Sequence, residues 1–352
     1  MRDDRIRGAA FAVALAVVSA AVLWIYLTDP GIDGFFAARF PDMIHGHAFK
    51  PYVYRALLPW TVRVLVAALP SGVRHAISVV SDGSPAWAFV SHTVHVHPDY
   101  FVEFAVASSL FFGCFAAFGL AFRDVVRRAY DTTPVVADVA ALAAVAAVPV
   151  MFSHGYSNYV YDPPTLFFGA LALSLLVRER VVAFTVVYAL ALLNKETAVL
   201  LAVLFAYHER GRLPASRYFT LLGVMLVAFV LSRVLLNALY GENPGAFTMV
   251  HFFDHNVGLL RSFSLPSLLS ALAFLVLVFG DWSRKPAILR EAMGMAIPLV
   301  GSCLVFGFVD EMRDYYEVYP AAVALIVPSV CRLMRVSVVT RQEPREEPAP
   351  ID

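Results

Sequence analysis

The sequence predicts an all-α membrane protein, a polytopic helical bundle with about ten transmembrane helices. Of the 352 residues, 60% are hydrophobic and only 15% are charged, whereas soluble domains carry about 25% charged residues. The mean hydropathy of +0.70 points the same way. Basic and acidic residues are equal in number, at 27 each, so the net charge does not suggest a nucleic-acid partner.

The first apolar segment, residues 8–27, is long enough to span a bilayer. A signal peptide is the alternative interpretation, because Val18-Ser19-Ala20 resembles a cleavage site. The apolar run continues to Leu27, which favours a first transmembrane helix with Trp24 and Tyr26 at the far interface.

Clusters of basic residues predict the topology, because segments that face the cytoplasm are rich in Lys and Arg. We assign six such clusters to the cytoplasm: residues 2–7, 123–128, 178–180, 210–217, 284–290 and 332–345. The predicted crossings are residues 8–27, 101–121, 134–153, 163–177, two arms within 181–207, and then 217–239, 265–280, 293–309 and 319–334. This arrangement predicts a multi-pass protein of the inner (plasma) membrane with both termini in the cytoplasm.

Residues 181–207 need a special arrangement, because a single helix there would place one flanking basic cluster outside. Two short helices that turn at Asn194-Lys195-Glu196-Thr197 keep both clusters inside. Each arm is shorter than a full span. We therefore expect the hairpin to turn below the outer surface, where surrounding protein shields it.

Residues 28–100 form the predicted first outer loop, and residues 1–335 form a single transmembrane domain. Within the loop, residues 56–69 are too short to span and carry Arg63, which predicts an interfacial helix with Pro59 in its first turn. Residues 70–100 are expected to lie outside the membrane. Residues 336–352 are rich in Pro and Glu, which predicts a disordered cytoplasmic tail.

With this topology, four groups of ionisable residues face the outer side. They are Asp29/Asp33/Asp42 with Arg55, residues 154–162, Lys195/Glu196, and residues 310–317. Charges at a membrane boundary are costly and usually mark a protein interior, a cavity or a partner. Their convergence on one side predicts a functional site.

Several of these residues also have a purely structural interpretation. Asp162 precedes Pro163, as an N-cap does, and Asn194 and Thr197 fit caps of the second hairpin arm. Lys195 and Glu196 fit either a structural ion pair or a phosphate-binding cation held in place by a carboxylate.

The arginines have two interpretations as well. Arg55 could extend to lipid headgroups or hold a lipid phosphate through two hydrogen bonds. Arg313 lies among four carboxylates, which fits a local salt-bridge network or an anion site. Arg233 and Arg261 are weaker candidates for binding an anionic group.

The sequence offers little support for a cofactor. His92, His95, His97 and Asp99 could ligate a metal, but no second ligand pair lies nearby, so a solvated loop is favoured. A divalent metal is possible but not required. The absence of P-loop, GxSxG, HExxH and dinucleotide motifs argues against a nucleotide-driven reaction.

The first loop combines Asp33, Phe35-Phe36-Ala37-Ala38, Gly46 and the segment from Tyr54 to Pro59. With this layout, the chain resembles the GT-C superfamily of polytopic glycosyltransferases over about residues 8–335. The YDPPTLFF, LLNKETAVLL and EMRDYYEVYP segments also resemble bacterial members. The chain departs from the family layout in two ways. It lacks an adjacent acidic pair in the first loop, and it lacks a large soluble outer domain.

The resemblance implies an inverting hexosyl- or pentosyltransferase of the cell envelope. Its donor would be a polyprenyl-phosphate-linked sugar. Its acceptor would be a lipid or glycan at the outer face of the membrane, and the protein would also contact membrane lipids. A non-catalytic lipid-linked-glycan binding protein or transporter with the same fold is the alternative.

The resemblance also implies roles for individual residues. Asp33 would be the general base by its position in the family layout, with Asp162 as the second carboxylate. The implied phosphate- and substrate-binding residues are Arg55, Lys195, Glu196, Arg313 and Tyr54, with Glu196 positioning Lys195.

Overall fold

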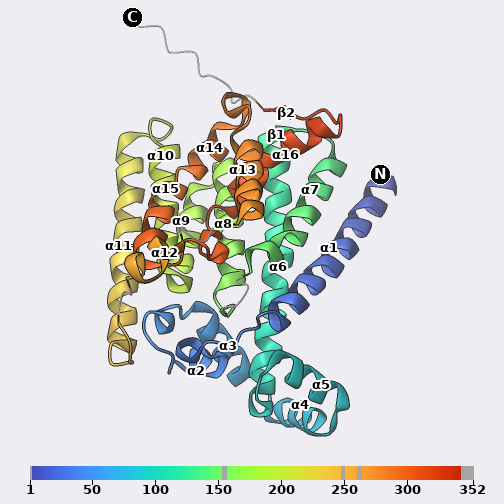
Figure 1. Ribbon diagram of the computed structural model, residues 1–352, viewed down its shortest axis with the longest axis vertical. Coiled ribbons are helices and arrows are strands. Elements are labelled where there is room, and N and C mark those ends of the chain that lie inside the picture. Colours follow the sequence, from blue (N-terminus) through green and yellow to red (C-terminus); the bar gives the residue numbers. More distant parts are fainter. Residues whose placement is uncertain (1, 153–156, 247–249, 260–263, 342–352) are drawn as a thin grey trace, which may run out of the picture.

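The computed structural model describes residues 2–152, 157–246, 250–259 and 264–341, and helices make up almost all of its regular structure (Figure 1). The predicted all-α class is confirmed. In the described part, five helices are long and apolar enough to cross a membrane: Asp4–Thr28, Phe101–Ala129, Pro134–Met151, Ala215–Tyr240 and Ala287–Phe306. Five shorter apolar helices accompany them: Asp162–Val177, Val181–Asn194, Glu196–His208, Leu268–Phe279 and Tyr319–Leu333. These lengths and compositions are those of a membrane protein.

The central helix of the bundle is α6 (Phe101–Ala129). The bundle helices that pack most extensively against it are α1 (Arg2–Thr28), α7 (Pro134–Ala146) and α8 (Asp162–Val177). A phenylalanine-rich face of α6 is buried at Phe104, Phe111, Phe115, Phe118 and Phe122, and Phe104 packs against Phe40 and Trp87 of the first loop. The spacing of these residues follows the helical repeat, so one face of α6 forms the core of the bundle.

A helical hairpin follows α8. Helix α9 (Val181–Asn194) ends where predicted, and α10 (Leu200–His208) begins after the short 3₁₀ turn η5 (Glu196–Val199). Lys195 has an extended backbone, with φ −155° and ψ 138°, so α9 cannot continue through it. The long helix α11 (Ala215–Tyr240) then runs back along the bundle (Figure 1).

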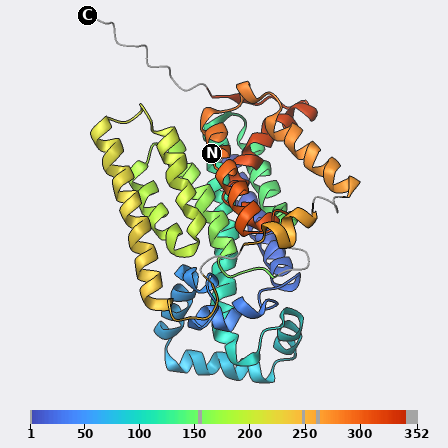
Figure 2. The same cartoon turned by 60° about the vertical axis from the view of Figure 1, so that its left-hand side comes forward.

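The first loop forms a separate group of helices at the end of the molecule opposite the start of α1 (Figures 1 and 2). Its helices are α2 (Phe40–His45), α3 (Leu57–Ala68), α4 (Ser71–Gly83) and α5 (Pro85–Val94), with 3₁₀ turns η1 (Phe36–Ala38), η2 (Tyr52–Tyr54) and η3 (Pro98–Tyr100). Helix α3 coincides with the helix expected at 56–69. Helices α3 and α4 together form a sixth apolar stretch long enough to span, but it is bent by 102°.

Helix α11 holds the first loop in place. The hydroxyl of Tyr240 accepts hydrogen bonds from Trp60 Nε1 (2.7 Å) and Arg63 Nη2 (3.2 Å) on α3. Lys50 Nζ donates to the Gly241 carbonyl just beyond α11. A Cβ on Gly46, where φ is +80°, would lie 3.0 Å from the Tyr240 ring, so the close approach of the loop to α11 needs glycine there.

The C-terminal third of the chain contains shorter helices. They are the π-helical turn η6 (Phe252–Asn256), α12 (Val257–Leu259), α13 (Leu265–Phe279), α14 (Ala287–Met293), α15 (Ala296–Phe306) and α16 (Tyr319–Leu333). The remaining 3₁₀ turns are η4 (Val148–Met151), η7 (Trp282–Arg284) and η8 (Met312–Tyr315).

A two-stranded sheet corrects part of the predicted tail. Strand β2 (Val339–Thr340) pairs antiparallel with β1 (Tyr130–Asp131), which connects α6 and α7. Residues 336–341 are therefore ordered, although residues 336–352 were expected to be disordered. Two residues are too few for strand periodicity to be visible in the sequence. Residues 342–352 lie outside the described residues.

Candidate functional site

Charged side chains from four distant segments meet at the end of the bundle that carries the first loop. We call this group the ionic cluster, and its members are Arg55, Asp162, Lys195, Glu196, Glu311, Arg313, Asp314 and Glu317. Most of them are almost inaccessible to solvent. Burying charge is costly unless each group finds a partner, so the pairings within the cluster determine what it can do.

Arg313, in η8, has several partners at once. Its Nη2 lies 2.5 Å from Glu311 Oε1, and its Nη1 lies 3.9 Å from Asp162 Oδ2. Nη1 also donates to the carbonyl of Ser157 at 2.9 Å. The guanidinium lies 3.9 Å from the centre of the Tyr159 ring, as in a cation–π contact. The predicted salt-bridge network around Arg313 is therefore present.

Lys195 lies at the break between α9 and α10, and only 4% of its side chain is exposed. Its Nζ is 3.3 Å from Glu317 Oε1 and 3.9 Å from Asp314 Oδ1. The Thr197 hydroxyl donates to the same Glu317 oxygen. Thr197 therefore does not cap the second hairpin arm as expected, because its hydroxyl links the turn to the residues before α16.

Asn194 also does not cap the second arm. Its Nδ2 donates to the Tyr161 carbonyl and to Thr165 Oγ1, both at 2.9 Å. These bonds join the end of α9 to the start of α8.

Arg55 follows η2 and binds Glu196 through two hydrogen bonds, Nη2 to Oε1 at 2.6 Å and Nε to Oε2 at 3.2 Å. Its guanidinium also lies 4.2 Å from the centre of the Tyr161 ring. Glu196 was expected to position Lys195, but its hydrogen bonds go to Arg55. Lys195 and Glu196 thus bind different partners, because the turn directs their side chains apart.

Asp162 is the first residue of α8 and is 2% exposed. The predicted N-cap role is wrong, since the helix has no side-chain cap. Its Oδ2 instead accepts a hydrogen bond from the Tyr159 backbone N–H at 2.9 Å and faces Arg313. The carboxylate therefore fixes the turn before α8 and contributes charge to the cluster.

Three tyrosines complete the site, and sequence reasoning missed their role. The rings of Tyr159 and Tyr161 stack with centroids 5.3 Å apart, and Tyr52 lies 5.2 Å from Tyr159. The YVYD spacing, with two tyrosines beside a predicted charged site, was the signal available. Tyr54, predicted to bind substrate, is buried and bonds instead to Asn237 Oδ1 on α11 at 3.2 Å.

Asp33 lies beside the cluster, and its carboxylate bonds to the first loop. Its Oδ1 accepts a hydrogen bond from the Phe40 N–H at 2.7 Å, at the start of α2. In the part of the chain that the structure describes, no hydrogen bond or ion pair joins Asp33 to the ionic cluster. The neighbouring Gly34 N–H donates to Ser157 Oγ at 3.3 Å, and the Ser157 carbonyl binds Arg313. Burial raises the pKa of Asp33 above its ordinary value, although the Phe40 hydrogen bond opposes this.

Other sequence candidates lie elsewhere. Arg233, on α11, donates from Nη2 to the Leu192 carbonyl near the end of α9 at 2.5 Å. Its charge acts on Glu196 and Arg55. Arg261 and His154 lie outside the described residues.

The structure also bears on metal binding. No group of three or more His, Cys, Asp or Glu side chains that could hold a metal ion occurs among the residues described. His92, His95, His97 and Asp99 are exposed. In this group, the ion pair between His97 Nδ1 and Asp99 Oδ2 spans 3.3 Å.

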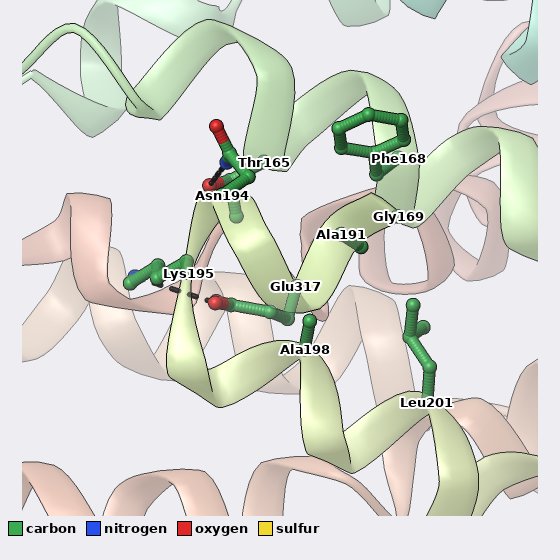
Figure 3. Close-up of a pocket in the computed structure, with 9 residues that line it drawn as sticks. All are labelled: Thr165, Phe168, Gly169, Ala191, Asn194, Lys195, Ala198, Leu201 and Glu317. Carbon is green, nitrogen blue, oxygen red and sulfur yellow. Dashed lines mark hydrogen bonds and ion pairs between the residues drawn. The ribbon is translucent and has the colours of Figure 1, made fainter. Parts of the chain in front are cut away.

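A small cavity of about 10 Å³ adjoins Lys195, between the α9–α10 hairpin, α8 and the segment before α16 (Figure 3). It is lined by Thr165, Phe168, Gly169, Ala191, Asn194, Lys195, Ala198, Leu201 and Glu317. Pockets for drug-sized ligands are about 300–1,000 Å³. This cavity, which we call the hairpin cavity, is far too small for such a ligand and has about the volume that one water molecule needs.

Comparison of the chain with protein-family models, curated proteins and solved structures gave no match. The resemblance described above therefore rests on the residues of this chain alone.

Proposed function

We propose that the protein is a GT-C-type glycosyltransferase that moves a sugar from a polyprenyl-phosphate carrier to an acceptor at the outer face of the membrane. The observation that carries the proposal is the meeting of Arg55, Lys195 and Arg313 in one cluster. These cations come from parts of the chain that are far apart, and they meet where the first loop joins the bundle. Fixed cations are what a departing lipid phosphate requires.

The proposal includes ten crossings of the inner membrane with both termini in the cytoplasm. The five long and five shorter apolar helices support that number. Basic residues at the far ends of α6 and α8 lie together, since Arg178 and Arg128 both bind Asp124, at 2.6 Å and 3.1 Å. With that end in the cytoplasm, the ionic cluster faces the outer side.

The transfer would proceed with inversion. An acceptor hydroxyl oxygen attacks the anomeric carbon, the bond from that carbon to the phosphate oxygen breaks, and polyprenyl phosphate leaves with the bonding electrons. A carboxylate takes the hydroxyl proton. The leaving phosphate gains negative charge, which Arg55, Lys195 and Arg313 stabilise.

Arg55 is the cation best placed to meet an incoming phosphate. Its partner Glu196 has 36% of its side chain exposed, whereas the partners of Arg313 and the nearest partner of Lys195 are almost completely buried. A phosphate could replace Glu196 on the guanidinium and keep two parallel hydrogen bonds. The tyrosine rings beside Arg55 offer flat apolar faces next to that position.

We assign the general base to Asp33, with Asp162 as the second carboxylate. Replacing Asp33 with asparagine should abolish most transfer in proteoliposomes supplied with a polyprenyl-phosphate sugar, by about 10²–10⁴-fold. Asn keeps an acceptor for the Phe40 N–H, so the start of α2 should remain intact. Asp42→Asn, in α2, is the matched control. Full turnover by the Asp33 variant would remove Asp33 as the base.

Transfer should depend on pH through the same residue. Burial raises the pKa of Asp33, and a base works only when deprotonated. The kcat/KM value should therefore rise with pH through a pKa above the ordinary Asp value of about 3.9, and it should fall as pH drops below that pKa. The measurement is kcat/KM against pH. If kcat/KM falls at low pH with the ordinary pKa of Asp, the assignment is contradicted.

A non-catalytic lipid-linked-glycan binding protein or transporter is the second candidate. It is favoured by one observation: each cation of the cluster already has a carboxylate partner. Cysteine labelling at Tyr52, a partly exposed residue whose ring lies beside Arg55, would distinguish the two. Labelling from both sides of the membrane would favour a transporter, whereas an enzyme with an outer active site should be labelled from outside only.

A further inference from the structure

Helix α11 carries a charged residue within its apolar length. The helix lies at the edge of the bundle, and most of its side chains are exposed (Figures 1 and 2). Its charged residues are Arg217, in the first turn, and Arg233. A charge inside a membrane helix is costly and usually has a partner. The surroundings of Arg233 therefore show what kind of group would balance its charge.

No carboxylate of the described part of the chain forms an ion pair with Arg233. Its Nη2 donates to the Leu192 carbonyl on α9 at 2.5 Å, and its Nε lies 3.4 Å from Ser232 Oγ. Nη1 has no hydrogen-bond partner among the same described residues. The charges that act most on Arg233 are those of Glu196 and Arg55, which already bind each other. These three side chains together carry one excess positive charge.

Arg233 lies at the margin between the packed face and the exposed face of α11. The neighbouring Ser232 and Leu236 are buried against the bundle, whereas Val230 and Val234 are exposed. Arg233 itself is partly exposed. A molecule in contact with the exposed face of α11 can therefore reach the guanidinium from the side, without passing through the ionic cluster.

A second hydrogen-bond donor lies one turn further along α11. Asn237 is exposed and follows Arg233 by four residues, so the two side chains are neighbours on the helix surface. The Tyr54 hydroxyl donates to Asn237 Oδ1 at 3.2 Å, and Nδ2 has no hydrogen-bond partner among the residues described. Arg233 and Asn237 thus offer donors to an approaching group, which is what an anion requires.

The position of Arg233 along α11 suits a lipid headgroup. The helix has 26 residues and is about 39 Å long, whereas the hydrocarbon core of a bilayer is about 30 Å thick. Arg233 precedes the end of the helix at Tyr240 by about 10 Å. From there a long arginine side chain reaches the headgroup region. Phosphate is the anionic group of lipids in that region, and a guanidinium binds it through two parallel hydrogen bonds.

We propose that Arg233 and Asn237 bind the phosphate group of a membrane lipid on the exposed side of α11, beside α9. The lipid chains would lie against exposed apolar side chains such as Val230 and Val234. The Leu192 carbonyl already holds Nη2, so the guanidinium is fixed before a lipid arrives and loses less freedom on binding. A bilayer phospholipid and a polyprenyl phosphate offer the same chemistry. This site is separate from the ionic cluster, and it does not depend on the proposed glycosyl transfer.

The test is the melting temperature of the full-length protein in a neutral detergent with added lipid. Phosphatidic acid and diacylglycerol share their chains and differ by the phosphate, and polyprenyl phosphate and polyprenol form a second such pair. A ligand of the folded state stabilises it, so the phosphate-bearing lipid of at least one pair should raise the melting temperature saturably, by on the order of 3 °C. The pair that responds identifies the source of the phosphate. Equal curves within both pairs would overturn the proposal, as would an equal rise with inorganic phosphate at the same concentration.

Two variants and a control locate the site. Arg233→Gln should raise the lipid concentration that gives half of the effect by about 10–100-fold, because it removes a charge-assisted contact. Asn237→Ala should raise it by about 2–10-fold, because its contact is neutral. Arg217→Gln is the matched control, since Arg217 is exposed at the other end of the same helix; it should leave the curve unchanged. An unchanged curve with Arg233→Gln or with Asn237→Ala would overturn the proposed pair.

A measurement on the unmodified protein covers the case in which the variants fail to fold. A photoactivatable analogue of phosphatidic acid or of polyprenyl phosphate, whichever lipid raised the melting temperature, should crosslink to α11 near Val230 and Val234. An excess of the unlabelled lipid should suppress the crosslink, and its phosphate-free counterpart should not. Crosslinks confined to other helices would overturn the proposal.

Discussion

Replacing Arg313 with methionine will lower the free energy of unfolding by about 3–5 kcal/mol. The guanidinium is almost completely buried and pairs with Glu311 and Asp162, and both of these carboxylates are buried as well. Methionine fills part of the space but removes the positive charge that lies 2.5 Å from Glu311 Oε1. Breaking a buried pair from one side exposes the full cost of the remaining charge. Chemical denaturation in detergent measures the loss.

Two controls distinguish this loss of stability from the effect of removing any arginine. Arg332 pairs with Asp281 at an exposed position, so Arg332→Met should cost only about 0–1 kcal/mol. Adding Glu311→Gln to the Arg313 variant should recover part of the lost stability, because it removes one buried negative charge beside Asp162 and the vacated guanidinium position. A cost below about 1 kcal/mol for Arg313→Met would mean that the pair is not buried as described.

Replacing Arg55 with lysine should slow sugar transfer by about 10²–10³-fold while leaving the fold intact. Arg55 makes two parallel hydrogen bonds to Glu196 and lies over the Tyr161 ring. Lysine keeps the positive charge but cannot make a two-point contact with a carboxylate or a phosphate. The rate in proteoliposomes with a polyprenyl-phosphate sugar is the measurement.

Arg63→Lys is the matched control for this prediction. Arg63 lies on the same loop but bonds to Tyr240, away from the ionic cluster. Its replacement should leave the transfer rate within a few-fold. If the two variants behave alike, Arg55 has no special role in holding the phosphate.

Most of the helical arrangement could be predicted because hydrophobicity and charge act over long segments. The break at Lys195 is an example. It follows from the need to keep the basic residues before α9 and after α10 on one side, and α9 does end at Asn194. The arginines and Lys195 of the cluster could be named because charged residues in apolar surroundings are conspicuous.

The partners of those residues could not be predicted, because they depend on side-chain directions across the fold. Asp33 was predicted as the base and Glu196 as the residue that positions Lys195, yet their hydrogen bonds go to Phe40 and Arg55. Tyr54 lies next to Arg55 in sequence but bonds to α11. A shift of one position in a turn changes the direction of a side chain, and sequence spacing does not record it.

Glu317 was noted only as one of several carboxylates before the last helix. Its position opposite Lys195 and beside Asn194 arises from the packing of the hairpin against α8 and the segment before α16. No local pattern marks one of its oxygens as bonded and the other as unpaired. That distinction requires the three-dimensional structure.

The length of α6 sets the height of the first-loop helices above the membrane. Its 29 residues correspond to about 43 Å, whereas the hydrocarbon core of a bilayer is about 30 Å thick. Its first residues extend to the loop helices, where the rings of Phe101 and Trp87 of α5 lie 4.0 Å apart. With the proposed topology, helices α4 and α5 lie at the level of the lipid headgroups. An acceptor for the proposed transfer would then be met within the headgroup layer, at a depth that a membrane-bound molecule reaches more readily than a soluble one.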